Sequence, residues 1–347
     1  MKRLVTISLL AMAAFSVKSQ ENQFSQYFTA SLFLNPGFAG VYSSPIASIN
    51  HRRQPGTADF VNELTQFSFI FPLKVEGTAE KPMGGVGITL LNDKTGLNGV
   101  FQSNAAFLTY AHNVKFGTID SEVLTLGIQA GYEIRSVAFS QLAWGSQYNP
   151  FLGFDELLPT PVTELDDQVG NLLVNAGIMY YYNSERDYLL YDYSAFSGIS
   201  VTNLNQPQQS FITDSDFRSP MLIKYNGGFE IKLKKLFIQP GLFFQYLQNN
   251  YQFNGGITLS FAPASDNFRT AGPEFLVGSW YRFRDSFIFL AGAKIDRVAV
   301  RFSYDLNTKL FAEDRDFNLS QNSLEVSIQY ILAPKDQGSR KSSNPLF

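Results

Sequence analysis

The strongest constraint on the fold comes from residues 297–306, where apolar side chains alternate with charged or small ones. Val298 and Phe302 fall on one face of this stretch, and Arg301 and Asp305 fall on the other. Successive side chains of a β-strand point to opposite faces, so the pattern predicts a strand with one apolar and one charged face. A soluble sandwich turns its apolar face inward, whereas a transmembrane barrel turns it to lipid around a polar lumen. One strand does not distinguish the two.

The same two-residue period recurs along the chain and predicts about fourteen strands, with twelve as the lower count. The candidate strands are 46–53, 64–72, 84–92, 100–116, 122–135, 170–182, 188–203, 221–233, 235–248, 251–262, 274–283, 286–294, 297–306 and 324–330. Many reach the roughly 9 to 11 residues that a tilted membrane strand needs. Pro240 lies inside one of them and predicts a bulge or a local break, because proline removes a ladder hydrogen bond.

The predicted connections differ in length between the two ends of such a barrel. The long ones are 136–169, 204–218 and 307–321, and short turns fall at 117–120, 183–187, near Lys234 and near Asp296. Outer-membrane barrels have short periplasmic turns and longer external loops. Residues 46–332 are therefore predicted to form an all-β, transmembrane, antiparallel β-barrel with periplasmic N- and C-termini. The connections 73–83 and 263–273 are longer than this rule expects, and the outer ones near 249–250 and 284–285 are shorter.

The first residues have the form of a secretory signal peptide. Lys2 and Arg3 precede an apolar run from Leu4 to Phe15, and a small-residue cleavage pattern ends at Ser19. Residues 1–19 are thus predicted to be removed on export, and the mature chain to lie in the cell outer membrane. The chain has no cysteine and 15% aromatic residues. A secreted β-sandwich or propeller stays open on composition alone.

Two segments fall outside the predicted strands. Residues 20–45 carry aromatic side chains without a regular period, and Asn35-Pro36-Gly37 is a turn signal. This segment is predicted to be either a periplasmic-side plug or an ordered lead-in to the first strand. Residues 333–347 are predicted to be a polar periplasmic tail.

The face that would line the lumen carries charges of both signs. The candidate lumen charges are Lys224, Glu230, Lys232, Arg297, Arg301 and Asp305. Such a set is compatible with pairing across the lumen, with a bound plug or with a solvated channel. Structural pairing is the interpretation that we favour.

Enzymatic motifs are absent from the sequence. It has two histidines, His51 and His112, and no cysteine, P-loop, G-x-S-x-G or H-E-x-x-H pattern. Residues 84–87 are glycine-rich but open a predicted strand, so they indicate a bend or a close backbone approach rather than a dinucleotide loop. The sequence therefore predicts no enzyme, no cofactor and no metal site, and its net charge of −3 gives no support to nucleic-acid binding. A membrane enzyme whose residues meet only in space stays formally open.

The long loop 136–169 is acidic and aromatic, with no Lys or Arg. The candidate partner-binding residues in it are Trp144, Asp155, Glu156, Asp166 and Asp167. Exposed aromatic residues often anchor interfaces, and a solvated surface loop is the alternative. The spacing of the acids matches no known calcium loop.

Several short motifs resemble those of the PorP/SprF family of the type IX secretion system of Bacteroidota. The residues that carry the resemblance near the start are Gln23-Phe24-Ser25-Gln26-Tyr27 and Asn35-Pro36-Gly37-Phe38-Ala39-Gly40, and those near the end are Gly278-Ser279-Trp280-Tyr281-Arg282, Ser303-Tyr304-Asp305 and Leu324-Glu325-Val326-Ser327-Ile328. The family often has alanine where Gly37 stands. Its G-Y-S-Y-D motif is replaced here by Arg301-Phe302-Ser303-Tyr304-Asp305.

The resemblance implies a non-enzymatic outer-membrane barrel that works with the secretion and gliding machinery. It also implies partners: other type IX components, and secreted cargo such as adhesins with type B C-terminal sorting domains, delivered to or anchored at the cell surface. A diffusion channel or a transporter of lipophilic molecules is the alternative, since it shares the barrel and a lumen of mixed charge.

Overall fold

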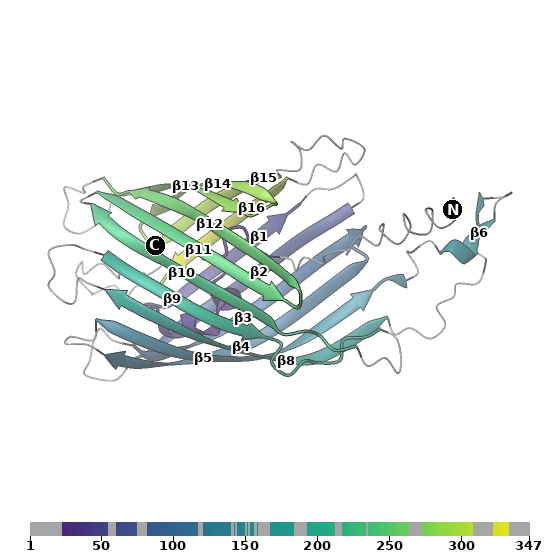
Figure 1. Ribbon diagram of the computed structural model, residues 1–347, viewed down its shortest axis with the longest axis horizontal. Helices are drawn as coiled ribbons and strands as arrows, with labels where there is room; N and C mark the ends of the chain where they lie inside the picture. Colours follow the sequence, from purple (N-terminus) through teal and green to yellow (C-terminus); the bar gives the residue numbers. More distant parts are fainter. Residues whose placement is uncertain are drawn as a thin grey trace, which may run out of the picture.

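The computed structural model describes most of the chain between residues 23 and 332. The described residues are 23–54, 60–74, 82–116, 121–139, 142, 144–149, 151, 153–155, 158, 167–183, 193–211, 217–233, 235–263, 273–307 and 322–332. Within them, fourteen antiparallel strands close into one barrel whose strands run obliquely to its long axis (Figure 1). The predicted signal peptide and the predicted tail lie outside the described residues.

Each strand pairs with its neighbours in chain order, and β1 closes the barrel against β16. The barrel strands are β1 (Ile46–Arg53), β2 (Phe60–Lys74), β3 (Pro82–Leu97), β4 (Phe101–Phe116), β5 (Glu122–Val137), β8 (Gln168–Asn183), β9 (Tyr193–Thr202), β10 (Leu222–Leu233), β11 (Leu236–Leu247), β12 (Asn250–Phe261), β13 (Glu274–Arg282), β14 (Ser286–Ile295), β15 (Val298–Asn307) and β16 (Ser323–Ile331). All fourteen predicted ranges overlap these strands. The two-residue strands β6 (Tyr148–Asn149) and β7 (Gly153–Phe154) pair with each other in the region predicted as loop 136–169.

The alternation seen in the sequence separates the inside of the barrel from its outer surface. In β15, Phe302 is 56% exposed on the outside, whereas Arg301 and Asp305 are buried inside. Other strands alternate in the same way, so the outer surface is lined with exposed Phe, Leu, Ile and Tyr side chains. No helix in the described part of the chain is long and apolar enough to cross a bilayer.

The two ends of the barrel differ in their connections. The end at which Ile46 and Ile331 lie is called the terminal end here, and the opposite one the loop end; Ile46 and Ile331 are paired directly. Between the strand bounds, the loop end carries the long connections 138–167, 203–221 and 308–322. The terminal end carries the tight turns 234–235 and 296–297. This asymmetry is the one predicted, including the longer terminal-end connections near 75–81 and 262–273. The predicted short turn at 183–187 is an exception, because the strand bounds leave a longer connection, 184–192, between β8 and β9.

The predicted break at Pro240 is present in the ladder between β10 and β11. The pairs stop at Gly228 and Gly241 and resume at Ile231 and Ile238 in the same register. On its other side Pro240 stays paired with β12. The missing N–H of proline thus interrupts one ladder and spares the other.

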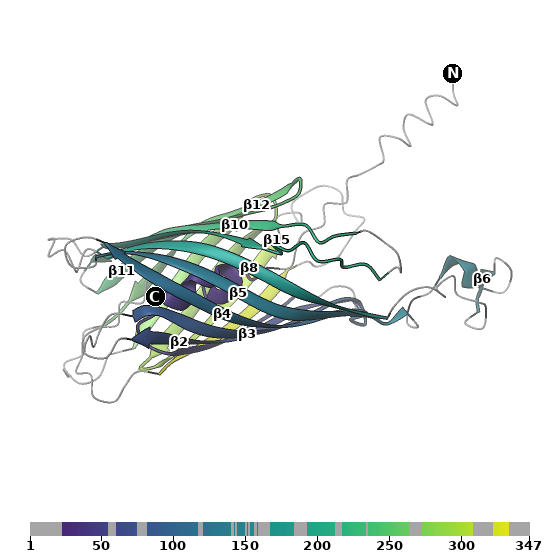
Figure 2. The ribbon, with the colours of Figure 1, turned by 90° about the horizontal axis from the view of Figure 1, so that it is seen from below.

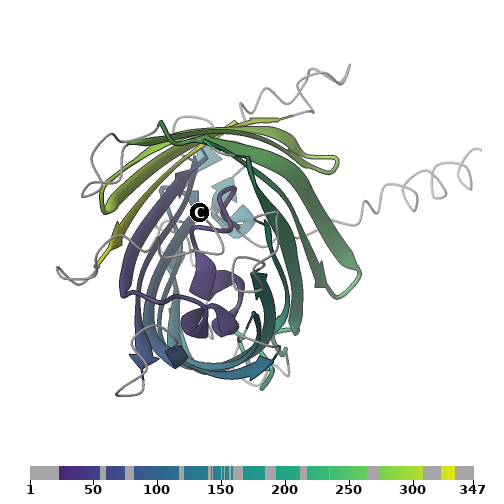
Figure 3. The same cartoon turned by 90° about the vertical axis from the view of Figure 1, so that its left-hand side faces the viewer.

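The chain before β1 folds inside the barrel. Every residue from 23 to 42 is buried except Phe33 and Val41, which are half-buried. This stretch, called the lumen segment here, contains the short helix α2 (Ser31–Leu34) and the 3-10 helix η1 (Pro36–Gly40). Figures 2 and 3 show it in purple within the ring of strands. Asn35 caps η1 by accepting the Gly37 N–H at 2.8 Å, which accounts for the predicted turn.

Candidate functional site

One half of the lumen segment lies against a belt of small residues on the inner wall. Gly85, Ala111, Gly127 and Gly177 are consecutive partners across β3, β4, β5 and β8. The belt continues to Ser200 of β9 through the pairing of β8 with β9. Because none of these residues has a large side chain, backbone approaches the wall closely here.

The lumen segment follows this belt from strand to strand, with Ala39 at β3, Gly37 at β5 and Asn35 at β8. An added Cβ at Gly85 would lie 1.9 Å from the Ala39 carbonyl oxygen, and one at Gly127 would lie 2.4 Å from the Gly37 nitrogen. Both contacts are to backbone, so neither can be relieved by a side-chain rotation. The glycine-rich start of β3 is thus a close backbone approach, as the sequence predicted.

Polar contacts fix the same half of the segment. The Asn35 amide donates to the carbonyl oxygens of Ile178 and Ile199, at 3.1 and 3.2 Å. The Ser200 hydroxyl donates to the Leu34 carbonyl at 2.7 Å. Next to it, the Lys224 ammonium donates to a backbone carbonyl of the segment at 2.9 Å and lies over the ring of the same residue, Phe33.

The other half of the lumen segment lies on a buried ionic cluster. Arg52 of β1, Arg282 of β13 and Asp305 of β15 meet there, with Asp305 Oδ2 at 3.6 Å from Arg52 Nη2 and 3.2 Å from Arg282 Nη1. Arg282 also bonds Asp285 at 3.0 Å. Glu325 of β16 completes the set, called the ionic cluster here. Opposite charges hold one another in place where water is excluded.

The Q-F-S-Q motif binds this cluster directly. The Ser25 and Gln26 N–H groups donate to the two Glu325 carboxylate oxygens, at 2.6 and 3.2 Å. The Ser25 hydroxyl accepts from Arg282 at 3.0 Å and donates to Asp305. The Gln26 side chain donates to the Ser303 hydroxyl at 3.2 Å. The opening motif and the closing S-Y-D motif, some 280 residues apart, are therefore partners in one site.

Aromatic residues pack between the two halves. The Tyr27 ring stacks on Phe243 with centroids 5.0 Å apart and meets Trp280 edge-on at 5.5 Å. Phe28 packs against Trp280 as well.

The lumen segment runs the length of the barrel rather than lying at one end. Ser25 contacts residues at the loop-end tips of β13, β15 and β16, whereas the Gly40 carbonyl accepts from Asn113, near the terminal end of β4, at 2.7 Å. The sequence placed the whole of 20–45 on the side of the termini. An even number of strands places Ile46 and Ile331 at the same end of the barrel. It says nothing about a preceding segment that turns back through the lumen.

The remaining candidate lumen charges differ in burial and in their partners, and one of them lies outside the strands. Arg301 is buried and interacts electrostatically with Glu274 and Tyr42. Glu230 accepts from Gln239 at 2.7 Å, and Lys232 is half-buried near the terminal end. Arg297 was expected within a strand, but it lies in the turn between β14 and β15, because β15 begins one residue later.

The candidate partner-binding residues lie beyond the loop end, away from the lumen. Trp144 precedes a short 3-10 helix and packs near the Phe139 ring, with centroids 6.5 Å apart. Asp155 and Asp167 are exposed. Glu156 and Asp166 lie outside the described residues.

Neither histidine belongs to the lumen site. His51 and His112 are exposed on the outer face of β1 and β4, and the His51 ring bonds the Thr65 hydroxyl at 2.8 Å.

The list of candidate lumen charges omitted three members of the ionic cluster. The side chains of Arg52, Arg282 and Glu325 point inward from their strands. The alternation that identified Asp305 as a lumen charge would have identified them too. The sequence gives less indication of the belt, because glycines on separate strands become neighbours only through the strand register.

Comparison with known proteins decides the family. The model of the family described as "Type IX secretion system membrane protein PorP/SprF" matches residues 16–330. The chain belongs to the PorP/SprF family. A search of curated proteins gives no match.

Solved structures similar to this PorP/SprF protein share the barrel fold at low identity. The CymD monoaromatic hydrocarbon channel is 10% identical with a TM-score of 0.46, covering 87% of this chain and 92% of that one. The Pseudomonas putida toluene transporter TodX is 9% identical with a TM-score of 0.43, covering 90% and 94%. The KdgM porin is 10% identical with a TM-score of 0.34, covering 82% and 98%.

Proposed function

We propose that this PorP/SprF protein is a non-enzymatic outer-membrane component of type IX secretion that helps deliver cargo proteins to the cell surface or anchor them there. The observation that carries the proposal is the meeting of the two family motifs inside the barrel. Ser25 and Gln26 bind Asp305, Ser303 and Glu325. Residues shared by a secretion family thus hold a segment within the lumen rather than line an open path.

The lumen segment is proposed to act as a plug. It is buried along nearly its whole length and is held from both sides, by the belt and by the ionic cluster. We place the terminal end in the periplasm and the loop end outside, because long loops of outer-membrane barrels face outward. Cargo such as adhesins with type B sorting domains would then dock at the loop end.

Recovery of partners from outer membranes tests this function. The tagged protein is expected to co-purify with a large surface adhesin and with other type IX components. We expect the double variant Asp155→Asn, Asp167→Asn to recover less cargo, because both acids are exposed beyond the loop end. The matched control is Asp296→Asn, which removes one exposed acid at the terminal end. Equal recovery from all three proteins would reject the loop end as the docking site.

Planar-bilayer conductance separates the plug from the alternative of a diffusion channel. A plugged barrel conducts little, and deletion of residues 23–40 is expected to raise its conductance. Unchanged conductance after the deletion would reject the plug, provided that circular dichroism shows an intact barrel. Solute uptake by the parent protein without any cargo partner would favour the channel.

A further inference from the structure

The hydrogen-bonded ladder between β10 and β11 has a gap near its middle. The ladder lacks the pairs at Phe229 and Glu230, opposite Pro240 and Gln239. Glycine flanks the gap, since Gly241 is paired with Gly228 on one side and with a third glycine, of β12, on the other. Proline lacks the donor and glycine lacks a side chain to cover the gap.

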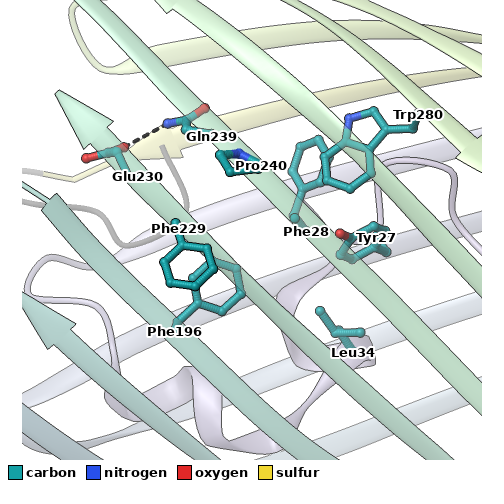
Figure 4. A pocket seen from close by; sticks show the side chains of 10 residues that line it. Tyr27, Phe28, Leu34, Phe196, Phe229, Glu230, Gln239, Pro240 and Trp280 are labelled. Atoms are coloured by element: carbon teal, nitrogen blue, oxygen red, sulfur yellow. Dashed lines mark hydrogen bonds between the residues drawn. The ribbon is translucent and has the colours of Figure 1, made fainter. Parts of the chain in front are cut away.

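A small cavity of about 20 Å³ lies at this gap. Phe229 and Pro240 line it from the outer face of the wall, whereas Tyr27 and Trp280 line it from the inside. Figure 4 shows the two groups on either side of the strands. Residues of both faces of the wall thus line the cavity, and Tyr27 among them belongs to the lumen segment.

The lining is almost wholly apolar. The polar side chains at the gap, Glu230 and Gln239, are hydrogen-bonded to each other at 2.7 Å. Gln239 Oε1 is buried without a hydrogen-bond partner. A buried water molecule needs about two to four polar partners, so this lining offers too few to hold one. The size of the cavity admits about one small group, which is too little for an aromatic ring.

The surroundings of the outer mouth indicate what enters it. Phe229 is 59% exposed, and Ile231 and Ile257 are exposed beside it. In the membrane placement proposed above, on which this inference rests, these side chains face lipid chains. The gap lies near the middle of β10 and β11, which is the depth where acyl chains end.

We propose that the gap between β10 and β11 is a lateral binding site for the end of a lipid acyl chain, which contacts Tyr27 and Trp280 through the wall. The lipid then becomes a third support of the lumen segment, beside the belt and the ionic cluster. The site takes a terminal methyl or methylene group and no polar headgroup.

Tryptophan fluorescence can test this site, because Trp144 and Trp280 are the two tryptophans of the chain. In a Trp144→Phe background Trp280 is the sole emitter, and it is 5% exposed inside the barrel. Bromine quenches tryptophan on contact. In phosphatidylcholine vesicles brominated at the chain ends, we expect the emission of Trp280 to fall relative to unbrominated vesicles.

Two variants in the Trp144→Phe background should abolish most of the fall in Trp280 emission. Pro240→Val returns the N–H and closes the ladder. Gly241→Ala fills the inner end of the cavity, where the new Cβ would lie 2.9 Å from the Trp280 ring. Leu242→Val, on the same strand and face as Pro240, is the matched control and should keep the loss. Quenching that is absent in the parent, or equal in all four proteins, overturns the site.

A separate reporter distinguishes this failure from failure of the membrane placement. A variant with Trp144→Phe, Trp280→Phe and Phe302→Trp carries one tryptophan on the outer face, where Phe302 is exposed. If its emission is quenched but that of Trp280 is not, the lateral site alone fails. If its emission is not quenched, the outer face does not meet lipid, and both proposals fail.

Discussion

The two halves of the lumen segment are held by opposite physical means. Residues 34–40 lie on the belt, where glycines bring backbone against backbone. Residues 25–26 lie on the ionic cluster, where charged side chains supply the bonds. The belt holds its half by shape and the cluster holds its half by charge. A belt contact therefore tolerates no added atom, whereas a cluster contact tolerates no lost charge.

The largest expected effect is at Asp305, which two buried arginines share. Asp305→Ala leaves Arg52 and Arg282 without this partner, so we expect the free energy of unfolding to fall by about 3–5 kcal/mol. Urea unfolding in vesicles, followed by the Trp280 emission, measures it. Asp305→Asn keeps the oxygen acceptor and should lose less. An unchanged free energy of unfolding in Asp305→Asn would contradict a role for the charge.

The belt is tested by adding one methyl group. In Gly85→Ala the new Cβ meets the Ala39 carbonyl oxygen, so the segment must shift, at a cost of about 1–3 kcal/mol in the free energy of unfolding. The same variant should raise the planar-bilayer conductance if the segment is a plug. Gly255→Ala is the matched control, since its Cβ would find its nearest atom at 3.4 Å. Equal effects of both variants would reject the close-packing account.

A smaller effect is expected for Asn35, whose side chain makes three hydrogen bonds in the belt half of the lumen segment. Asn35→Ala removes the bonds to the Ile178 and Ile199 carbonyls and the cap of η1. We expect the unfolding free energy to fall by about 1–2 kcal/mol. In Asn35→Ser a neutral cap oxygen is kept but the amide donor is lost, so its stability should lie between those of the parent and Asn35→Ala if the cap matters. The same unfolding measurement decides.

The smallest effect is expected outside the lumen. Arg53 and Glu63 form an ion pair at 3.3 Å, with the arginine side chain 65% exposed. Glu63→Gln should change the unfolding free energy by less than about 1 kcal/mol, because solvent screens this pair. A loss as large as that of Asp305→Ala would show that burial is not what separates the two ion pairs.

Much of the barrel could be predicted from the sequence because its signals are local. The pleat turns successive side chains to opposite faces, so Arg301 and Phe302 fall on different faces of one strand. The strand lengths and the difference between the connections at the two ends then indicate that the charged face is inside. The fourteen strand ranges and the long loops follow from the same pattern and its interruptions. The break at Pro240 follows from one missing N–H.

The candidate site could be predicted only in part. Asp305 and the Q-F-S-Q motif were identified separately, by alternation and by resemblance. That they bind each other was not foreseen, and neither was the path of residues 23–45 from the loop end to the terminal end. No short-range pattern encodes a contact between Ser25 and Glu325.

The sequence by itself determined which side chains face inward, how many strands form and where the chain turns. The tertiary structure alone decided what those inward side chains meet. Gly85, Gly127 and Gly177 form a belt because the strand register aligns them. Arg52 and Asp305 share a cluster because closure of β1 on β16 brings the two ends of the chain together. The physical reason is range: the pleat repeats every two residues, whereas register and closure depend on the whole chain.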